Sequence, residues 1–110
     1  MPSPAEMLLV YVTCGDGEEA RRIGRVLVEE RLAACVNFRG HESIYRWHGA
    51  IESASEWGLL AKTTRACWPA LEMRVRALHS YSLPCIIAWP LAEGLPPYLD
   101  WIEESTEVPS

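Results

Sequence analysis

A change of hydrophobic period marks the stretch from Glu29 to Gly49 as the centre of this chain. Helical spacing ends near Ala34, and apolar side chains then recur every second residue, as in a strand whose side chains alternate between two faces. One predicted face carries Val36, Phe38 and Ile44, and the other carries Cys35, Ser43, Tyr45 and Trp47. Because both faces are partly apolar, we expect a long strand that reaches past its own sheet. Gly40 interrupts the alternation and predicts a bulge that bends this strand.

The residues on either side predict further strands and a helix. Met7 to Thr13 is apolar without alternation, which favours a central strand covered on both faces. A capping box at Asp16 and Glu19, followed by an apolar stripe at helical spacing, predicts a helix from about Gly17 to Arg31. After a tight turn, Ile51 to Thr63 is typical of a return strand that makes a hairpin with the long strand.

Prolines set the limits of the remaining elements. Pro69 cannot lie inside a regular helix, so the second helix begins near Trp68 or is distorted there, and it extends to about His79. Cys85 to Trp89 is a short apolar stretch bracketed by two prolines, which favours a strand at a sheet edge. The Pro96-Pro97 pair starts a terminal helix.

This order of elements predicts the ferredoxin-like α+β fold, βαββαβ with an additional C-terminal helix, in a single domain of residues 1–110. Right-handed crossovers place both main helices on one face of the sheet. The other face then has no cover within the chain, although Tyr45 and Trp47 put apolar area there. We therefore expect other subunits to bury it.

Composition narrows the possible partners. An apolar fraction of 49% with five Trp is high for 110 residues and favours an oligomer. Ten Lys plus Arg against fifteen Asp plus Glu give no electrostatic basis for binding nucleic acid. The first residues do not resemble a signal peptide and no apolar run approaches ~18 residues, so we expect a cytoplasmic protein without a membrane partner. The four cysteines lack a Cys-x-x-Cys spacing and are expected to be reduced thiols.

Few residues carry an obvious chemistry. No nucleotide-binding or nucleophile motif is present. Lys62 lies among apolar neighbours, and its default interpretation is an edge lysine whose stem covers apolar surface. His79 at a helix end is by itself an ordinary stabilising feature. Cys14 follows the first strand alone, where copper chaperones of this fold carry a Cys-x-x-Cys pair.

Several segments together are distinctive enough to suggest a family. They are Val12–Cys14, Glu29–Asn37, Ser43–Gly49, Lys62–Thr64, Leu78–Pro84 and Tyr98–Trp101. In this order they closely resemble the CutA family of divalent-cation tolerance proteins over about residues 7–105. The resemblance implies a tight homotrimer, similar in architecture to the PII signalling proteins. It also implies a role in tolerance of copper and other divalent metals, without a settled enzymatic activity.

The resemblance further implies two sets of site residues. A cleft between subunits is lined by residues that match Cys35, Trp47, Lys62, His79 and Tyr81, and copper ligation is associated with the positions of Cys14 and His79. This chain departs from the family where two carboxylates are replaced by Ser82 and Cys85. With Lys62 nearby in the family geometry, we expect the cleft to accept an anion or a soft cation such as copper, and not magnesium or calcium.

Three interpretations of function remain open at the level of sequence. The first is a trimeric, non-enzymatic protein that binds copper, another soft metal ion or a small ligand at intersubunit clefts. The second is a trimeric scaffold or signalling protein that binds no metal and whose cysteines only fill the core. The third is an enzyme of unknown reaction that uses Lys62, His79 and Tyr81 in the cleft; no identifiable nucleophile–base pair accompanies them.

Overall fold

The computed structural model describes residues 6–109, which form a four-stranded sheet and three helices. In chain order the elements are β1 (Met7–Cys14), α1 (Gly17–Glu29), β2 (Cys35–Trp47), β3 (Ala50–Thr64), α2 (Trp68–Leu78), β4 (Ile86–Pro90) and α3 (Pro96–Glu104). The strand order across the antiparallel sheet is β2-β3-β1-β4. The predicted ferredoxin-like α+β fold with an additional C-terminal helix is thus confirmed.

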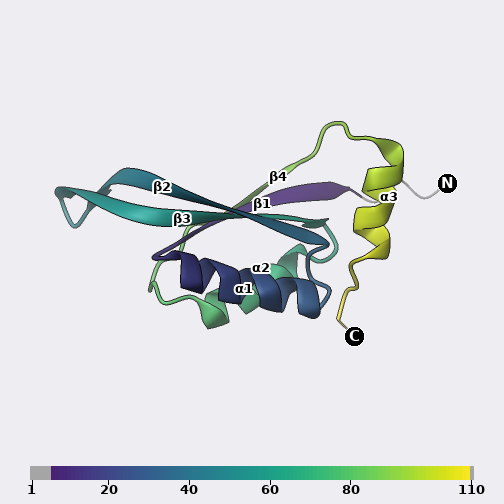
Figure 1. The fold of residues 1–110 in the computed structure, drawn as a ribbon, viewed down its shortest axis with the longest axis horizontal. Coiled ribbons are helices and arrows are strands. Elements are labelled where there is room, and N and C mark those ends of the chain that lie inside the picture. Colours follow the sequence, from purple (N-terminus) through teal and green to yellow (C-terminus); the bar gives the residue numbers. More distant parts are fainter. Residues whose placement is uncertain (1–5, 110) are drawn as a thin grey trace.

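Two layers make up the body of the molecule. Helices α1 and α2 lie side by side on one face of the sheet (Figure 1). The fully buried side chains between the two layers are those of Val10, Val12, Leu59 and Ala61 from the sheet and Ile23, Leu27, Leu71 and Val75 from the helices. Burying one such large aliphatic side chain contributes about 1.5–3 kcal/mol, so this layer supplies most of the stability. Helix α3 lies at the end of the sheet, where its Ile102 is buried (Figure 1).

Short sequence motifs determine where the helices begin and where the hairpin turns. The Asp16 side chain accepts a hydrogen bond from the Glu19 backbone N–H at 2.8 Å and caps α1. Helix α2 begins at Trp68, so Pro69 falls in its first turn, where the missing N–H costs no intrahelical bond. Residues His48 and Gly49 form the hairpin turn with φ of 48° and 82°, the left-handed conformations of a type I′ turn.

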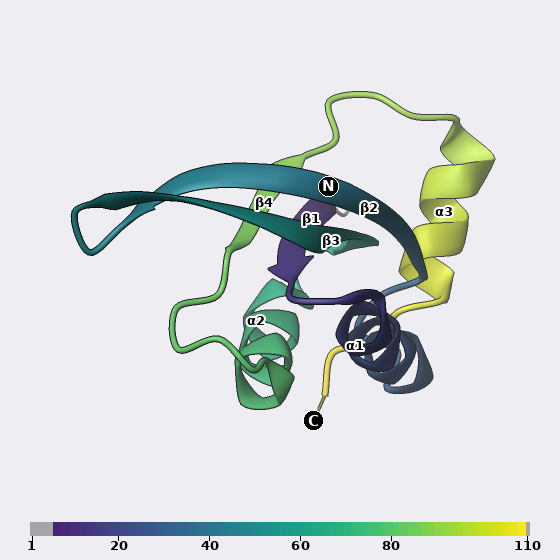
Figure 2. The same cartoon turned by 60° about the vertical axis from the view of Figure 1, so that its left-hand side comes forward.

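Strands β2 and β3 continue beyond the sheet as a two-stranded arm of residues 41–56. Pairing of β3 with β1 stops at Trp57, whereas pairing with β2 continues to Trp47 opposite Ala50. The arm projects from the body and curves (Figures 1 and 2). Ile44 and Tyr45 lie on its opposite faces and both are exposed, which confirms the apolar residues predicted on two faces.

The bulge predicted at Gly40 is wrong. The β2–β3 register is unbroken, and Gly40 pairs directly with Trp57. A Cβ atom at Gly40 would lie 3.4 Å from the Trp57 ring. The glycine therefore leaves room for the neighbouring indole on the helix-covered face instead of kinking the strand.

The sheet face opposite α1 and α2, here called the open face, has no helix over its centre among residues 6–109 (Figure 2). Its side chains alternate with those of the core and include Tyr11, Leu60, Ile87 and Trp89. Ile87 is 51% exposed and Trp89 is also exposed. Of the helices described, none is both long enough and apolar enough to cross a membrane.

Replacing Ile102 with Ala tests how α3 is anchored. The Ile102 side chain is fully buried, so truncating it should leave a cavity and lower the free energy of unfolding by about 2–5 kcal/mol. Denaturant titration at one fixed protein concentration measures this loss. The exposed Val108→Ala is the control and should change stability little; equal midpoints for the two variants would contradict the assignment.

Candidate functional site

The five residues expected to line a cleft fall into two groups within one chain. The first group is Cys35 and Lys62, which face each other across β2 and β3. Lys62 Nζ donates to Asn37 Oδ1 at 3.0 Å, lies 3.9 Å from Cys35 Sγ and lies 5.7 Å from the centre of the Tyr98 ring. Because β3 runs between β2 and β1, the interpretation of Lys62 as an edge lysine is wrong. Its ammonium group is instead a positive charge on the open face, kept in place by these contacts.

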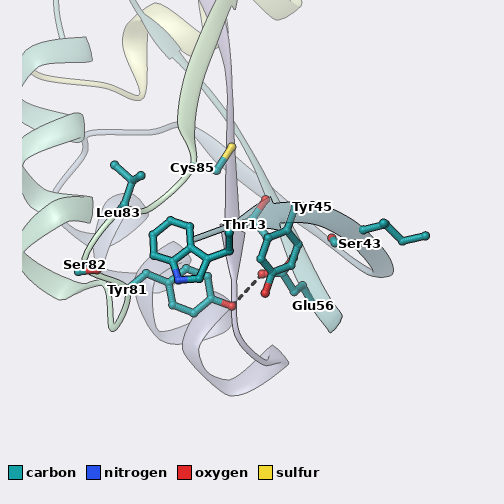
Figure 3. A pocket seen from close by; sticks show the side chains of 10 residues that line it. Thr13, Ser43, Tyr45, Glu56, Tyr81, Ser82, Leu83 and Cys85 are labelled. Carbon is teal, nitrogen blue, oxygen red and sulfur yellow. Dashed lines mark hydrogen bonds between the residues drawn. The ribbon is translucent and has the colours of Figure 1, made fainter. Parts of the chain in front are cut away.

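The second group surrounds an open pocket of about 550 Å³, here called the arm pocket (Figure 3). The pocket lies between the arm, the end of β1 and residues 81–85. Trp47 and Tyr81 line it together with Tyr45 and Glu56, and Cys85 also contributes. His79 lies next to this group, since its ring centre is 4.9 Å from that of Tyr81.

A hydrogen bond orients the polar part of the arm pocket. Tyr81 Oη donates to Glu56 Oε2 at 2.8 Å (Figure 3). Burial, together with the Glu56 carboxylate, raises the pKa of Tyr81, so the phenol keeps its proton at neutral pH. The sequence did not single out Glu56. The only available signal was that Glu56 and Lys62 are an even number of positions apart, which places both side chains on the same face of a strand.

The two groups are far apart within one subunit. Glu56 and Lys62 lie on the same face of β3 but six positions apart, which corresponds to about 20 Å at a rise of about 3.3 Å per residue. The charged residue beside residues 81–85 is therefore the negative Glu56. The positive charge of Lys62, which was expected there, does not reach the arm pocket within a single chain. One chain alone does not assemble the cleft.

A second cluster joins the end of β1 to the segment after α2. Ligand atoms of Cys14, Glu19 and His79 all lie within 4.8 Å of one another. Cys14 and His79 were predicted as a metal pair, and the structure brings them together. Glu19 was missed as a member of this cluster, because its place in the capping box assigned it to the start of the helix.

Two groups in this cluster, the Glu19 carboxylate and the His79 ring, already have hydrogen-bond partners. Glu19 Oε1 accepts the Gly15 N–H at 3.0 Å, and Oε2 accepts the Ser80 N–H at 2.8 Å. His79 Nε2 lies 2.7 Å from the Thr13 carbonyl oxygen, while Nδ1 accepts the Tyr81 N–H at 3.0 Å. Since a carbonyl only accepts, the proton of a neutral His79 ring is on Nε2.

The protonation states follow from burial and these hydrogen bonds. Burial, with the nearby Glu19 charge, raises the pKa of Cys14 to about 12, so its side chain is a neutral thiol at pH 7. Burial alone would raise the pKa of Glu19, but hydrogen bonds from Ser80 and Gly15 outweigh it and lower the pKa below the usual 4.5. The sulfur of Cys14 and the imidazole of His79 suit a soft metal ion such as copper. A metal here would have to displace the Cys14 proton and one hydrogen bond of His79.

Replacing Glu19 with Gln should destabilise the protein in a pH-dependent way. Hydrogen bonds to a charged group are worth about 1.5–3 kcal/mol, and we expect a loss of about 2 kcal/mol at pH 7. Because folding lowers the pKa of Glu19, its stabilisation is complete above the unfolded value of 4.5 and is lost as the pH falls through the lower folded value.

Urea titrations at pH 7 and pH 3 measure this effect, with Glu93→Gln, which changes an exposed carboxylate, as the control. The wild type and Glu19→Gln should differ at pH 7 and converge at pH 3. A difference that does not depend on pH would contradict the assignment.

Comparison with known proteins gives close matches over nearly the whole chain. The family model described as CutA1 divalent ion tolerance protein matches residues 8–105. A divalent-cation tolerance protein CutA from Thermus thermophilus is 52% identical over 99 residues, which cover 89% of this chain and 96% of that protein. The mouse Protein CutA is 43% identical over 105 residues, covering 94% of this chain and 59% of that longer protein.

Solved structures agree with these sequence matches. The divalent cation tolerance protein from Thermus thermophilus gives a TM-score of 0.89 at 50% identity, covering 92% of this chain and 99% of that one. A CutA from Archaeoglobus fulgidus, described as a periplasmic divalent cation tolerance protein, gives 0.90 at 42% identity, with coverage of 92% and 99%. This chain therefore belongs to the CutA1 family of divalent ion tolerance proteins.

Proposed function

We propose that the protein acts as a homotrimer whose clefts between subunits bind a small ligand, without catalysing a reaction. The observation that carries this proposal is the division of the five cleft residues. Cys35 and Lys62 lie at one end of the open face, and Trp47, Tyr81 and His79 lie at the other. A head-to-tail contact between copies brings one end against the other, and three such contacts form a closed ring when each is related to the next by a one-third turn.

The apolar surface of the open face supports the same assembly. Ile87 and Trp89 are exposed on the open face of the edge strand β4, and Tyr45 and Trp47 are exposed on the arm. Large contiguous apolar patches are uncommon on monomers and mark interaction surfaces. A neighbouring copy that covers this face also places its own Lys62 end near the arm pocket, so the same contact both hides the patch and completes the cleft.

Replacing Ile87 with Asp tests the trimer. A carboxylate in the centre of a buried interface should cost a few kcal/mol per subunit and dissociate the assembly at micromolar concentration. Native mass spectrometry and light scattering report the subunit number. Met73→Asp is the matched control, because Met73 is 68% exposed but lies on α2, away from the open face. A wild type that is a stable folded monomer, or dissociation by both variants, would contradict the proposal.

A second candidate function is binding of copper at Cys14, Glu19 and His79. The proximity of a thiol, an imidazole and a carboxylate favours it. The family name, divalent-cation tolerance, is consistent with a metal ligand. The sulfur and imidazole ligands favour a soft ion over hard ions such as magnesium and calcium. Because the pKa of Cys14 is raised, such an ion has to compete with a proton for the sulfur.

Calorimetry with copper(I) under anaerobic conditions tests this candidate. Cys14→Ser and His79→Ala should each weaken binding at least about tenfold, whereas Cys67→Ser, which changes a buried cysteine outside the cluster, should not. Because the Cys14 pKa of about 12 lies above the working range, displacing its proton should make affinity rise with pH. Unchanged affinity in both cluster variants, or tight calcium binding, would contradict the site.

The expected cytoplasmic location stays a prediction. The Archaeoglobus fulgidus relative is described as periplasmic and the Arabidopsis thaliana relative as chloroplastic. Family membership alone therefore does not determine the compartment.

A further inference from the structure

Strand β3 carries a carboxylate on the open face that has no positive partner within its own chain. Glu56 is only 7% exposed. Within residues 6–109, no Lys, Arg or His nitrogen lies within 4.0 Å of its carboxylate oxygens. The Tyr81 hydroxyl donates a hydrogen bond to it but is neutral. A nearly buried carboxylate costs free energy unless a cation pairs with it.

Lys62 is the complementary positive group at the other end of this face. In the part of the chain that the structure describes, no carboxylate oxygen lies within 4.0 Å of its ammonium nitrogen. Asn37 Oδ1 accepts one of its N–H groups at 3.0 Å, and the centre of the Tyr98 ring is 5.7 Å away. These neutral groups hold the ammonium in place without balancing its charge. A side chain that is already held loses less entropy when it forms an ion pair.

A neighbouring copy can supply the partner that one chain cannot. Glu56 and Lys62 are six positions apart on β3, so their backbones are about 20 Å apart within a subunit. In the proposed head-to-tail contact, the Lys62 end of one copy lies against the arm of the next, and the base of that arm carries Glu56. Opposite charges placed at the two ends of one self-complementary surface fix the register of the contact and disfavour wrong alignments.

We infer that Glu56 of each copy forms an ion pair with Lys62 of a neighbouring copy, so that every contact in the ring contains one such pair. The inference deepens the proposed function and rests on it, because it requires the head-to-tail assembly. In a closed ring each carboxylate has its ammonium group, whereas an open chain of copies leaves one of each unpaired at its ends. The pairing therefore also favours closure of the ring.

Two other basic residues on the open face are alternative partners of Glu56. His41 lies opposite it on β2, but among the described residues no hydrogen bond joins the two. Arg39 lies two residues before His41 on the same face and is exposed. A long exposed side chain loses more conformational entropy on pairing than Lys62, which is already held. Lys62 is therefore the favoured partner, and Arg39 is the alternative that the experiment has to separate from it.

A double-mutant cycle on the assembled protein tests the pairing. Glu56→Gln removes the negative charge but keeps an acceptor for Tyr81, and Lys62→Gln removes the ammonium group. Sedimentation over a dilution series, at a fixed urea concentration where the wild type begins to dissociate, measures the apparent dissociation constant. Circular dichroism verifies that each variant is folded.

The expected result is a clear departure from additivity. Each single change leaves one charge unpaired in the interface and should weaken assembly at least about tenfold. The double change removes both charges and should weaken assembly no more than either single change. Residues about 20 Å apart in one chain act additively, so this departure reports a contact between copies. Lys62→Met, which keeps the apolar stem, gives a second cycle with the same expectation.

Arg39→Gln replaces Lys62→Gln in the matched control cycle, because Arg39 is an exposed positive charge on the same face. Its effect should add to that of Glu56→Gln. Additive effects with Lys62, or a departure from additivity with Arg39 instead, would overturn the inference. An intact wild-type trimer with additive effects overturns the ion pair alone, whereas a monomeric wild type overturns the trimer and the ion pair together, so the two failures are distinguishable.

Discussion

The long antiparallel pairing of β2 with β3 is the interaction on which the other features depend. Its register is continuous from Cys35 opposite Lys62 to Trp47 opposite Ala50. Each step along a strand turns the side chain to the other face, so a continuous register fixes which residues share the open face. Lys62 and Glu56 share it because nothing shifts the pairing between them. Because Lys62 and Glu56 are far apart along the strand, their opposite charges cannot pair within one subunit.

The Glu19 carboxylate has a comparable role at the other side of the sheet. It fixes the loop after β1 through Gly15 and the segment after α2 through Ser80. That segment carries both His79, in the cluster with Cys14, and Tyr81, in the arm pocket. The two candidate sites are therefore joined by two residues of backbone.

Patterns within short segments predicted the fold well because they act locally. The Asp16 cap, the helix start near Pro69 and the edge strand between prolines all depend on neighbouring residues. The site was only partly predictable, since its members come from distant segments. Cys14 and His79 were expected together from family resemblance, and the structure adds Glu19 to this pair.

The missed Glu56 and the wrong bulge at Gly40 both result from contacts between residues that are distant in the sequence. Glu56 was missed because one glutamate in an alternating strand has no distinguishing signal until Tyr81 donates to it. Gly40 was assigned to a bulge because a glycine in a strand has the same sequence pattern whether it bends the backbone or makes room for a side chain. Only the position of Trp57 across the ladder separates these cases.

The two-residue turn at the tip of the arm has a consequence for how this protein can diverge. His48 and Gly49 both adopt left-handed backbone conformations, and their number fixes the pairing of the whole arm. Adding or removing one residue there can shift the register and turn Tyr45 and Trp47 to the face they now avoid. Substitutions at the turn alter its stability, whereas changes of its length alter which chemistry the arm presents. Insertions and deletions in this turn are thus less readily tolerated during evolution than substitutions.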